Sequence, residues 1–210
     1  MRSLETMLEK SARNSFSASE IDQAQRAAQR LLDTARQRGL IDVSYTKVDS
    51  PFGKLLIAAT TSGLVRLAFP EQEDEQILQD LARRISPRVL EAPTSLDPVR
   101  RELDEYFAGT RRAFEVALDW KLIGPFACKV LRLTSAIPYG ALSTYGQLAS
   151  GVGVPRGSRA AGNALGSNPI PIVIPCHRVL RAGGHLGGYA GGLDRKRWLL
   201  ELEGAIPPAR

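Results

Sequence analysis

A cysteine and a histidine stand side by side in the sequence Pro175-Cys176-His177-Arg178. They follow the apolar run 170–174, which is too hydrophobic to lie on the surface. Burial raises the pKa of a thiol and makes it inert, and an adjacent histidine is the usual device that activates it as a nucleophile. A Cys-His pair alone is more often a packed cysteine beside an unrelated ring, so the neighbouring sequence has to decide.

The composition is that of an ordinary globular protein. With 210 residues, 43% of them hydrophobic and 24% charged, the chain can form one large domain or two small ones. No apolar run approaches the ~20 residues of a membrane span, and the first ten residues lack the apolar core of a secretory signal. Two cysteines and two histidines argue against a disulfide framework and a structural zinc site. We therefore expect a cytoplasmic protein with reduced thiols, no bound metal and no membrane partner.

Charge is distributed unevenly along the chain. Residues 1–120 carry a net charge of −2, whereas residues 121–210 carry +8. No acidic residue occurs between Asp119 and Asp194, although this stretch contains several lysines and arginines. A surface kept basic only for solubility usually mixes both signs. The pattern therefore favours a nucleic acid as the partner.

The first half of the chain has the pattern of a helical extension followed by an α+β domain. In residues 1–42 apolar side chains recur at helical spacing, and Gly39 follows as a stop signal. We expect strands and helices beyond this extension, with no catalytic motif among them. The expected strands are 45–48, 55–60, 64–69 and 114–118, and the expected helices are 71–86 and 98–109.

The second half is expected to be mostly helical, with helices at 125–136, 144–150, 157–166 and 194–203. Ser143 or Thr144 would cap the second of these. The two short helices at 144–150 and 157–166, joined by a glycine-containing turn, match a helix-turn-helix. The later helix has small residues and one arginine, which suits close approach to a narrow groove. The glycine-rich stretch 182–192 is interpreted as a pocket wall around its tyrosine.

The segment Ile-Pro-Ile-Val-Ile-Pro-Cys-His-Arg-Val (170–179) lies after Gly-Ser-Asn-Pro and before Gly-Gly-Tyr-Ala-Gly-Gly-Leu. In this context it closely resembles the O6-alkylguanine-DNA alkyltransferases. The likeness runs unbroken from about Pro125 to Gly204, is weaker over 45–118, and is absent over 1–40. It implies an α+β fold, with a ribonuclease H-like domain at 43–119 and a winged helix-turn-helix domain at 120–210.

The resemblance implies an irreversible reaction, in which one cysteine takes an alkyl group from O6 of guanine in duplex DNA. The protein is consumed and needs no cofactor. By the same resemblance Cys176 is the alkyl acceptor, and His177 is the base that activates it through a bridging water. Glu203 is the carboxylate that orients this histidine. Asn168 fixes the turn before the active-site strand, and Tyr145 crowds the target phosphate and contacts the flipped base.

The resemblance also assigns the DNA and pocket contacts. Arg159 matches a finger that enters the base stack, and the DNA-binding surface is expected to continue over Ala160, Gly162 and Asn163. The expected pocket residues are Val179, Gly187, Tyr189 and Ala190, with the carbonyls of Cys176 and Val179 reading the guanine amino group. Ala190 stands where some members have serine, and the extension has no counterpart. We expect a monomer that binds double-stranded DNA; cooperative binding stays open.

Two other classes of protein stay open at this point. The first is a Cys/His hydrolase, which would need an oxyanion hole and a histidine placed separately in the sequence, and would turn over. The second is a DNA-binding module that reads damage without repairing it. Such family-like proteins have another residue in place of the cysteine, whereas Cys176 is present here.

Overall fold

The computed structural model describes residues 17–37 and 39–208, and the chain divides at residue 41 into two compact units. The first unit contains helix α2 (Ala18–Gln37). Ser17 begins this helix with a capping box, because its hydroxyl accepts from the backbone N–H of Glu20 and its own N–H donates to the Glu20 carboxylate. Helix α2 lies within the expected extension at 1–42, while the part expected at 1–16 lies outside the described residues.

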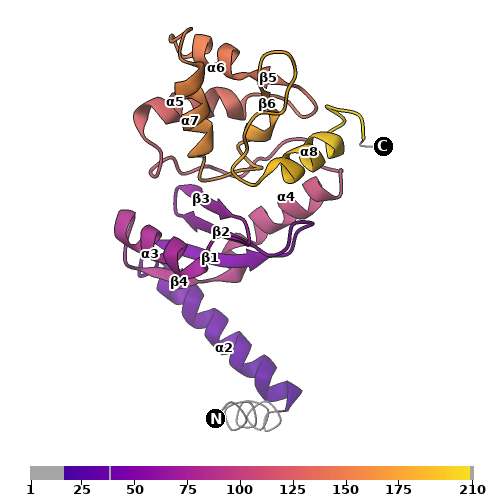
Figure 1. Ribbon diagram of the computed structural model, residues 1–210. Coiled ribbons are helices and arrows are strands. Elements are labelled where there is room, and N and C mark those ends of the chain that lie inside the picture. The colour runs from indigo at the N-terminus through magenta and orange to yellow at the C-terminus, as the bar shows by residue number, and fades with distance from the viewer. Residues whose placement is uncertain (1–16, 38, 209–210) are drawn as a thin grey trace, which may run out of the picture. The chain divides into compact units, whose positions relative to one another are not determined.

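The second unit contains a four-stranded sheet in the order β3-β2-β1-β4 (Figure 1). Strands β1 (Val43–Val48), β2 (Leu55–Thr60) and β3 (Gly63–Ala68) are antiparallel neighbours. The short strand β4 (Val89–Glu91) pairs in parallel with β1, and helix α3 (Asp74–Arg84) connects it to β3. Three residues are too few for a recognisable alternation, which explains why the sequence pattern missed β4.

Side chains of the sheet alternate between two hydrophobic cores, as the pleat of a strand requires. Leu56 and Ala58 of β2 belong to a small core together with Ile77 and Leu81 of α3. The residues between them face the opposite side and enter the main core, which continues through η1 (Pro93–Leu96) and α4 (Asp97–Phe107) into the helical part of the chain. One continuous core therefore joins the sheet to the helices that follow.

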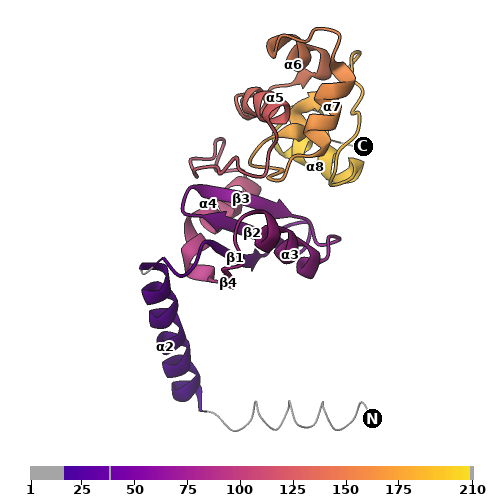
Figure 2. The ribbon, with the colours of Figure 1, turned by 90° about the vertical axis from the view of Figure 1, so that its left-hand side faces the viewer.

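The helical part consists of α5 (Pro125–Ser135), α6 (Tyr145–Gly151), α7 (Ser158–Gly166) and α8 (Leu193–Leu202) (Figures 1 and 2). Helices α5, α6 and α7 pack on one another, and α6 and α7 form the expected helix-turn-helix. Thr144 caps α6 with a full capping box, since its side chain accepts from the N–H of Gln147 and the Gln147 side chain accepts from its N–H. Two short parallel strands, β5 (Ser143–Thr144) and β6 (Val179–Leu180), tie the start of α6 to the segment after Cys176.

The prediction of a strand at 114–118 is wrong. This segment makes only an isolated bridge between Leu118 and Leu64, and the N–H of Glu115 donates instead to the Glu102 side chain at 2.8 Å. A backbone N–H that donates to a side chain cannot at the same time donate to a neighbouring strand.

No helix among the described residues is long and apolar enough to cross a membrane.

Candidate active site

Cys176 lies at the end of a buried turn and not at the end of a strand. The prediction of an active-site strand at this position is therefore wrong. The N–H of Ile174 donates to the carbonyl of Ile170 at 2.9 Å, and Ile172 between them has φ 73°. Pro171 and Pro175 lack the N–H groups that a strand ladder needs. A positive φ is unusual for a β-branched residue and strains the backbone. The turn ends in the short 3-10 helix η2 (Cys176–Arg178), which carries the thiol.

Asn168 holds this turn together and reaches the sulfur. Its Oδ1 accepts from the N–H of Ile170 at 3.0 Å, and its Nδ2 donates to the carbonyl of Ile174 at 2.9 Å. The same Nδ2 lies 3.2 Å from the Sγ of Cys176 and donates to it. One amide therefore fixes both ends of the turn and supplies a hydrogen bond that favours the thiolate.

The Cys176 thiol is protonated at neutral pH. Burial raises its pKa to about 11, and the hydrogen bond from Asn168 and the charge of Lys196 act in the opposite direction without overcoming burial. The side chain is only 5% exposed. A thiol in this state reacts only if a nearby base accepts its proton.

Glu203, just beyond α8, is the centre of a buried polar cluster. Its Oε1 accepts from the Tyr106 hydroxyl at 2.6 Å, and its two oxygens accept from Nε and Nη2 of Arg178, both at 2.8 Å. Burial raises the pKa of this carboxyl, but the hydrogen bonds and charges of His177 and Arg178 outweigh burial and bring the pKa to about 2. The carboxylate is therefore ionised throughout the physiological range.

The ionised carboxylate defines the tautomer of His177. The Nε2 of His177 lies 2.9 Å from Oε1 of Glu203. An ionised carboxylate only accepts hydrogen bonds, so Nε2 must carry the proton and Nδ1 the free lone pair. Burial lowers the pKa of His177, so the ring is neutral, and Nδ1 is buried without a hydrogen-bond partner among the described residues. His177 is thus a neutral base with an accepting nitrogen, next in sequence to the thiol.

Lys196 of α8 is a buried cation that the sequence did not reveal. Its Nζ donates to the carbonyl of Val179 at 2.6 Å and lies 3.5 Å from that of Gly188. Burial lowers its pKa to about 8, while the neighbouring Cys176 thiolate would raise it. In sequence this lysine is one of three consecutive basic residues on a helix, so nothing distinguishes it from a solvated side chain.

A cavity of about 510 Å³ opens over the thiol. The second helix of the helix-turn-helix forms one wall with Arg159, Gly162 and Asn163, while Ala160 lies exposed on that helix beside them. The remaining lining residues come from α6, the α7 end and the segments around Cys176, and include Tyr145, Arg181, Gly188, Tyr189 and Ala190. The cavity thus joins a nucleophile to a helix that is free to meet a partner.

Two tyrosines line the cavity, and among the described residues neither hydroxyl makes a short hydrogen bond. The Tyr145 hydroxyl donates only a long hydrogen bond of 3.3 Å, to the carbonyl of Gly188. The Tyr189 hydroxyl is buried without a partner among the described residues, and burial raises the pKa of both phenols. Gly187 is not among the lining residues. A Cβ at this position would lie 2.8 Å from the Tyr145 hydroxyl.

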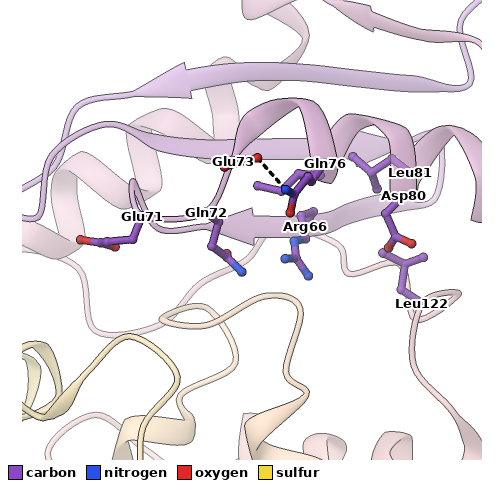
Figure 3. Close-up of a pocket in the computed structure, with 9 residues that line it drawn as sticks. Arg66, Glu71, Gln72, Glu73, Gln76, Asp80, Leu81 and Leu122 are labelled. Carbon is purple, nitrogen blue, oxygen red and sulfur yellow. Dashed lines mark hydrogen bonds between the residues drawn. The ribbon is translucent and has the colours of Figure 1, made fainter.

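A second cavity of about 420 Å³ lies between β3 and α3 (Figure 3). Arg66 points into this cavity between acidic and amide side chains. The lining residues of this second cavity include neither cysteine nor histidine. Among the described residues no group of three histidine, cysteine or acidic side chains could hold a metal ion. Cys176 and the exposed helix α7 therefore meet at the first cavity, and His177 is next in sequence to the thiol.

Two protein-family models match most of the chain beyond the extension. The ribonuclease-like domain of 6-O-methylguanine DNA methyltransferase matches residues 43–120, and the DNA-binding domain of the same proteins matches residues 125–205. This agrees with the α+β fold expected from the sequence, with a ribonuclease-like part followed by a helix-turn-helix part. Residues 1–42 lie outside both models.

Individual relatives match over nearly their whole length. The methylated-DNA--protein-cysteine methyltransferase of Mycobacterium tuberculosis is 40% identical over 167 residues, which cover 80% of this chain and 96% of that protein. The constitutive enzyme of the same name from Bacillus subtilis is 37% identical, covering 76% of this chain and 94% of that one.

Solved structures agree with these relatives. The crystal structure of M. tuberculosis O6-methylguanine methyltransferase superposes with a TM-score of 0.67 at 40% identity, covering 80% of this chain and 96% of that one. The M. tuberculosis protein OGT in complex with DNA gives a TM-score of 0.66 over 76% of this chain and 92% of that one, also at 40% identity. Taken with the two family models, these matches show that the chain belongs to the 6-O-methylguanine DNA methyltransferase family.

Proposed function

We propose that this protein repairs DNA by direct reversal, moving the alkyl group of O6-alkylguanine irreversibly to Cys176. The observation that carries the proposal is the position of the thiol. It lies at the floor of a cavity walled by the second helix of a helix-turn-helix, next in sequence to a neutral histidine that an ionised carboxylate orients. The family membership supports the same reaction.

The chemistry requires one proton to move from sulfur to the departing guanine. The Nδ1 of His177, through a bridging water, accepts the proton of Cys176, and the thiolate attacks the alkyl carbon. The bond between that carbon and O6 breaks, and its electron pair stays with guanine. The Tyr145 hydroxyl gives guanine a proton and is reprotonated by the histidine and solvent. The sulfur ends as a thioether, so each molecule acts once.

The target base must leave the duplex to reach a buried sulfur, at a cost of roughly a few kcal/mol. Arg159, exposed on α7, offsets this cost by entering the stack in place of the base. Ala160, Gly162 and Asn163 let the helix backbone come close to DNA, and the positive charge of residues 121–210 supplies affinity without sequence preference.

Inside the cavity the flipped guanine is held by the wall and by backbone groups. Tyr189 and Ala190 flank the alkyl group, and Asn168 keeps the sulfur in place. The carbonyl oxygens of Cys176 and Val179 accept hydrogen bonds from the guanine amino group. The Val179 oxygen already accepts from Lys196, and its second lone pair is free for the guanine. Because the reaction needs a reduced thiol, we place the protein in the cytoplasm.

The experiment that tests this function is a titration with duplex DNA that carries a radiolabelled methyl group on guanine O6. Label should move to the protein and saturate at one methyl per chain, because the thioether is not reversed. The Cys176→Ser variant should bind the duplex and take no label. Continued release of product beyond one equivalent would indicate a hydrolase, and binding without transfer would indicate a damage reader; either would contradict the proposal.

A further inference from the structure

The backbone of Arg181 is held in place by hydrogen bonds, and the residue is exposed. It follows β6 directly, and its N–H donates to the carbonyl of His185 at 2.8 Å while its own carbonyl accepts from Gly184 at 3.1 Å. A Cβ built on Gly187 would lie 3.2 Å from the Cγ of Arg181 and 2.8 Å from the Tyr145 hydroxyl. The stem of Arg181 therefore runs beside the Tyr145 ring, and the residue lines the cavity with Cys176.

The guanidinium of Arg181 has no hydrogen-bond or ion-pair partner in the described part of the chain. The hydrogen bonds and ion pairs found among the described residues include none made by this group, unlike that of Arg178, which is fully engaged with Glu203 and the carbonyl of Ile137. Among the described residues that line the cavity none is acidic, and the other cation is Arg159. The positive charge of Arg181 acts on the neighbouring Tyr145 and lowers the pKa that burial raises.

We propose that Arg181 makes the site selective for O6 substituents that end in a carboxylate, with O6-carboxymethylguanine as the simplest example. This inference rests on the proposed alkyl transfer and names the class of substrate that the site prefers. A guanidinium presents a planar pair of N–H donors that matches a carboxylate, and such charge-assisted bonds are about twice as strong as neutral ones. A cation without a protein partner in a cavity free of carboxylates is available for this contact.

The reaction balances as it does for a methyl group. The thiolate of Cys176 attacks the methylene carbon, the bond from that carbon to O6 breaks, and the electron pair leaves with guanine, which takes up the proton lost by the thiol. The product on the protein is S-carboxymethylcysteine. The carboxylate keeps its charge throughout, so Arg181 can hold it before and after transfer.

The test compares two substituents of nearly equal size, O6-carboxymethyl and O6-carbamoylmethyl, in the same duplex sequence. Second-order rates of transfer to Cys176 are measured for wild type, Arg181→Gln and Arg181→Glu, each also with an O6-methyl duplex. Arg197→Gln is the matched control, because Arg197 is exposed on α8 and does not line the cavity. Wild type should favour the carboxymethyl group, and Arg181→Gln should reduce the carboxymethyl-to-carbamoylmethyl rate ratio about tenfold.

The outcomes separate the inference from the function on which it rests. Arg181→Glu should lower the ratio further, and Arg197→Gln should leave it at the wild-type value. A ratio that does not change in either Arg181 variant would overturn the inference, as would equal slowing of all three substituents, which would make Arg181 a phosphate contact. Absence of methyl transfer in the wild type would contradict the proposed function itself.

Discussion

The side chain of Glu203 lies 2.9 Å from Nε2 of His177, although the two residues are 26 positions apart in the sequence. The same carboxylate holds Arg178 through both of its oxygens. It therefore orients the ring of His177 and neutralises a buried cation.

Acid should destabilise the protein through this cluster. The folded-state pKa of Glu203 is about 2, below its ordinary 4.5, so its contribution is complete above pH 4.5 and is lost as the pH falls towards 2. The difference corresponds to on the order of 3 kcal/mol. His177 adds to the loss below its ordinary pKa of 6.5, because burial keeps it neutral only in the folded state.

Urea unfolding at pH values between 7 and 2.5 measures this dependence. The double variant Glu203→Gln with Arg178→Met removes both charges, so no cation is left unpaired, and its unfolding free energy should fall less steeply with acid. Parallel curves for wild type and the double variant would contradict the assignment.

Arg159→Ala should impair repair of duplex DNA far more than reaction with free O6-alkylguanine, because only the duplex requires base flipping. A loss of at least tenfold on the duplex is expected, with the free base reacting at about the wild-type rate. Rates on the two substrates are compared in parallel, with Arg156→Ala as an exposed control that does not line the cavity. Equal losses on both substrates would refute the role of Arg159 in the stack.

Gly187→Ala tests how the glycine-rich segment supports Tyr145. The sequence places Gly187 among the expected pocket residues. If this glycine left room for bulky O6 groups, alanine would slow O6-benzyl more than O6-methyl substrates. The structure gives Gly187 φ 66° and puts an added Cβ 2.8 Å from the Tyr145 hydroxyl. Alanine should therefore displace Tyr145 and slow both substrates by similar factors, about tenfold.

Gly184→Ala is the matched control for backbone strain. Gly184 also has a positive φ of 82°, but a Cβ there would meet nothing within 4 Å. The Gly184→Ala variant should be less stable than wild type but should transfer alkyl groups at about the wild-type rate. Selective slowing of O6-benzyl in Gly187→Ala would instead show that Gly187 leaves room for bulky O6 substituents.

Lys196→Met should slow transfer from duplex and free base alike. The buried ammonium lowers the pKa of Cys176 and donates to the carbonyl of Val179. Without it the thiol pKa rises, so the pH at which the rate increases should move upwards. The pH–rate profile of the variant is compared with that of Arg197→Met, the exposed neighbour. Two identical profiles would show that Lys196 only fills space.

The adjacent pair Cys176 and His177 could be found from the sequence because the two residues are neighbours and follow an apolar run. The helix-turn-helix could be predicted as well, since Thr144 and the small residues of α7 give local signals. Lys196 and Tyr106 could not be found, because their significance depends on burial and on partners 17 and 97 positions away. The turn at Ile172 was also missed, since a run of β-branched residues favours a strand and the left-handed conformation is imposed by the surrounding contacts.

The most direct test of the account is to locate the transferred group. The protein is incubated with a duplex containing O6-methylguanine, digested, and its two cysteine peptides are examined by mass spectrometry. The account predicts one methyl group, on Cys176, with Cys128 unmodified, and a Cys128→Ser variant that reacts like wild type. A methyl group on Cys128, or an unmodified protein with the lesion still in the duplex, would contradict it.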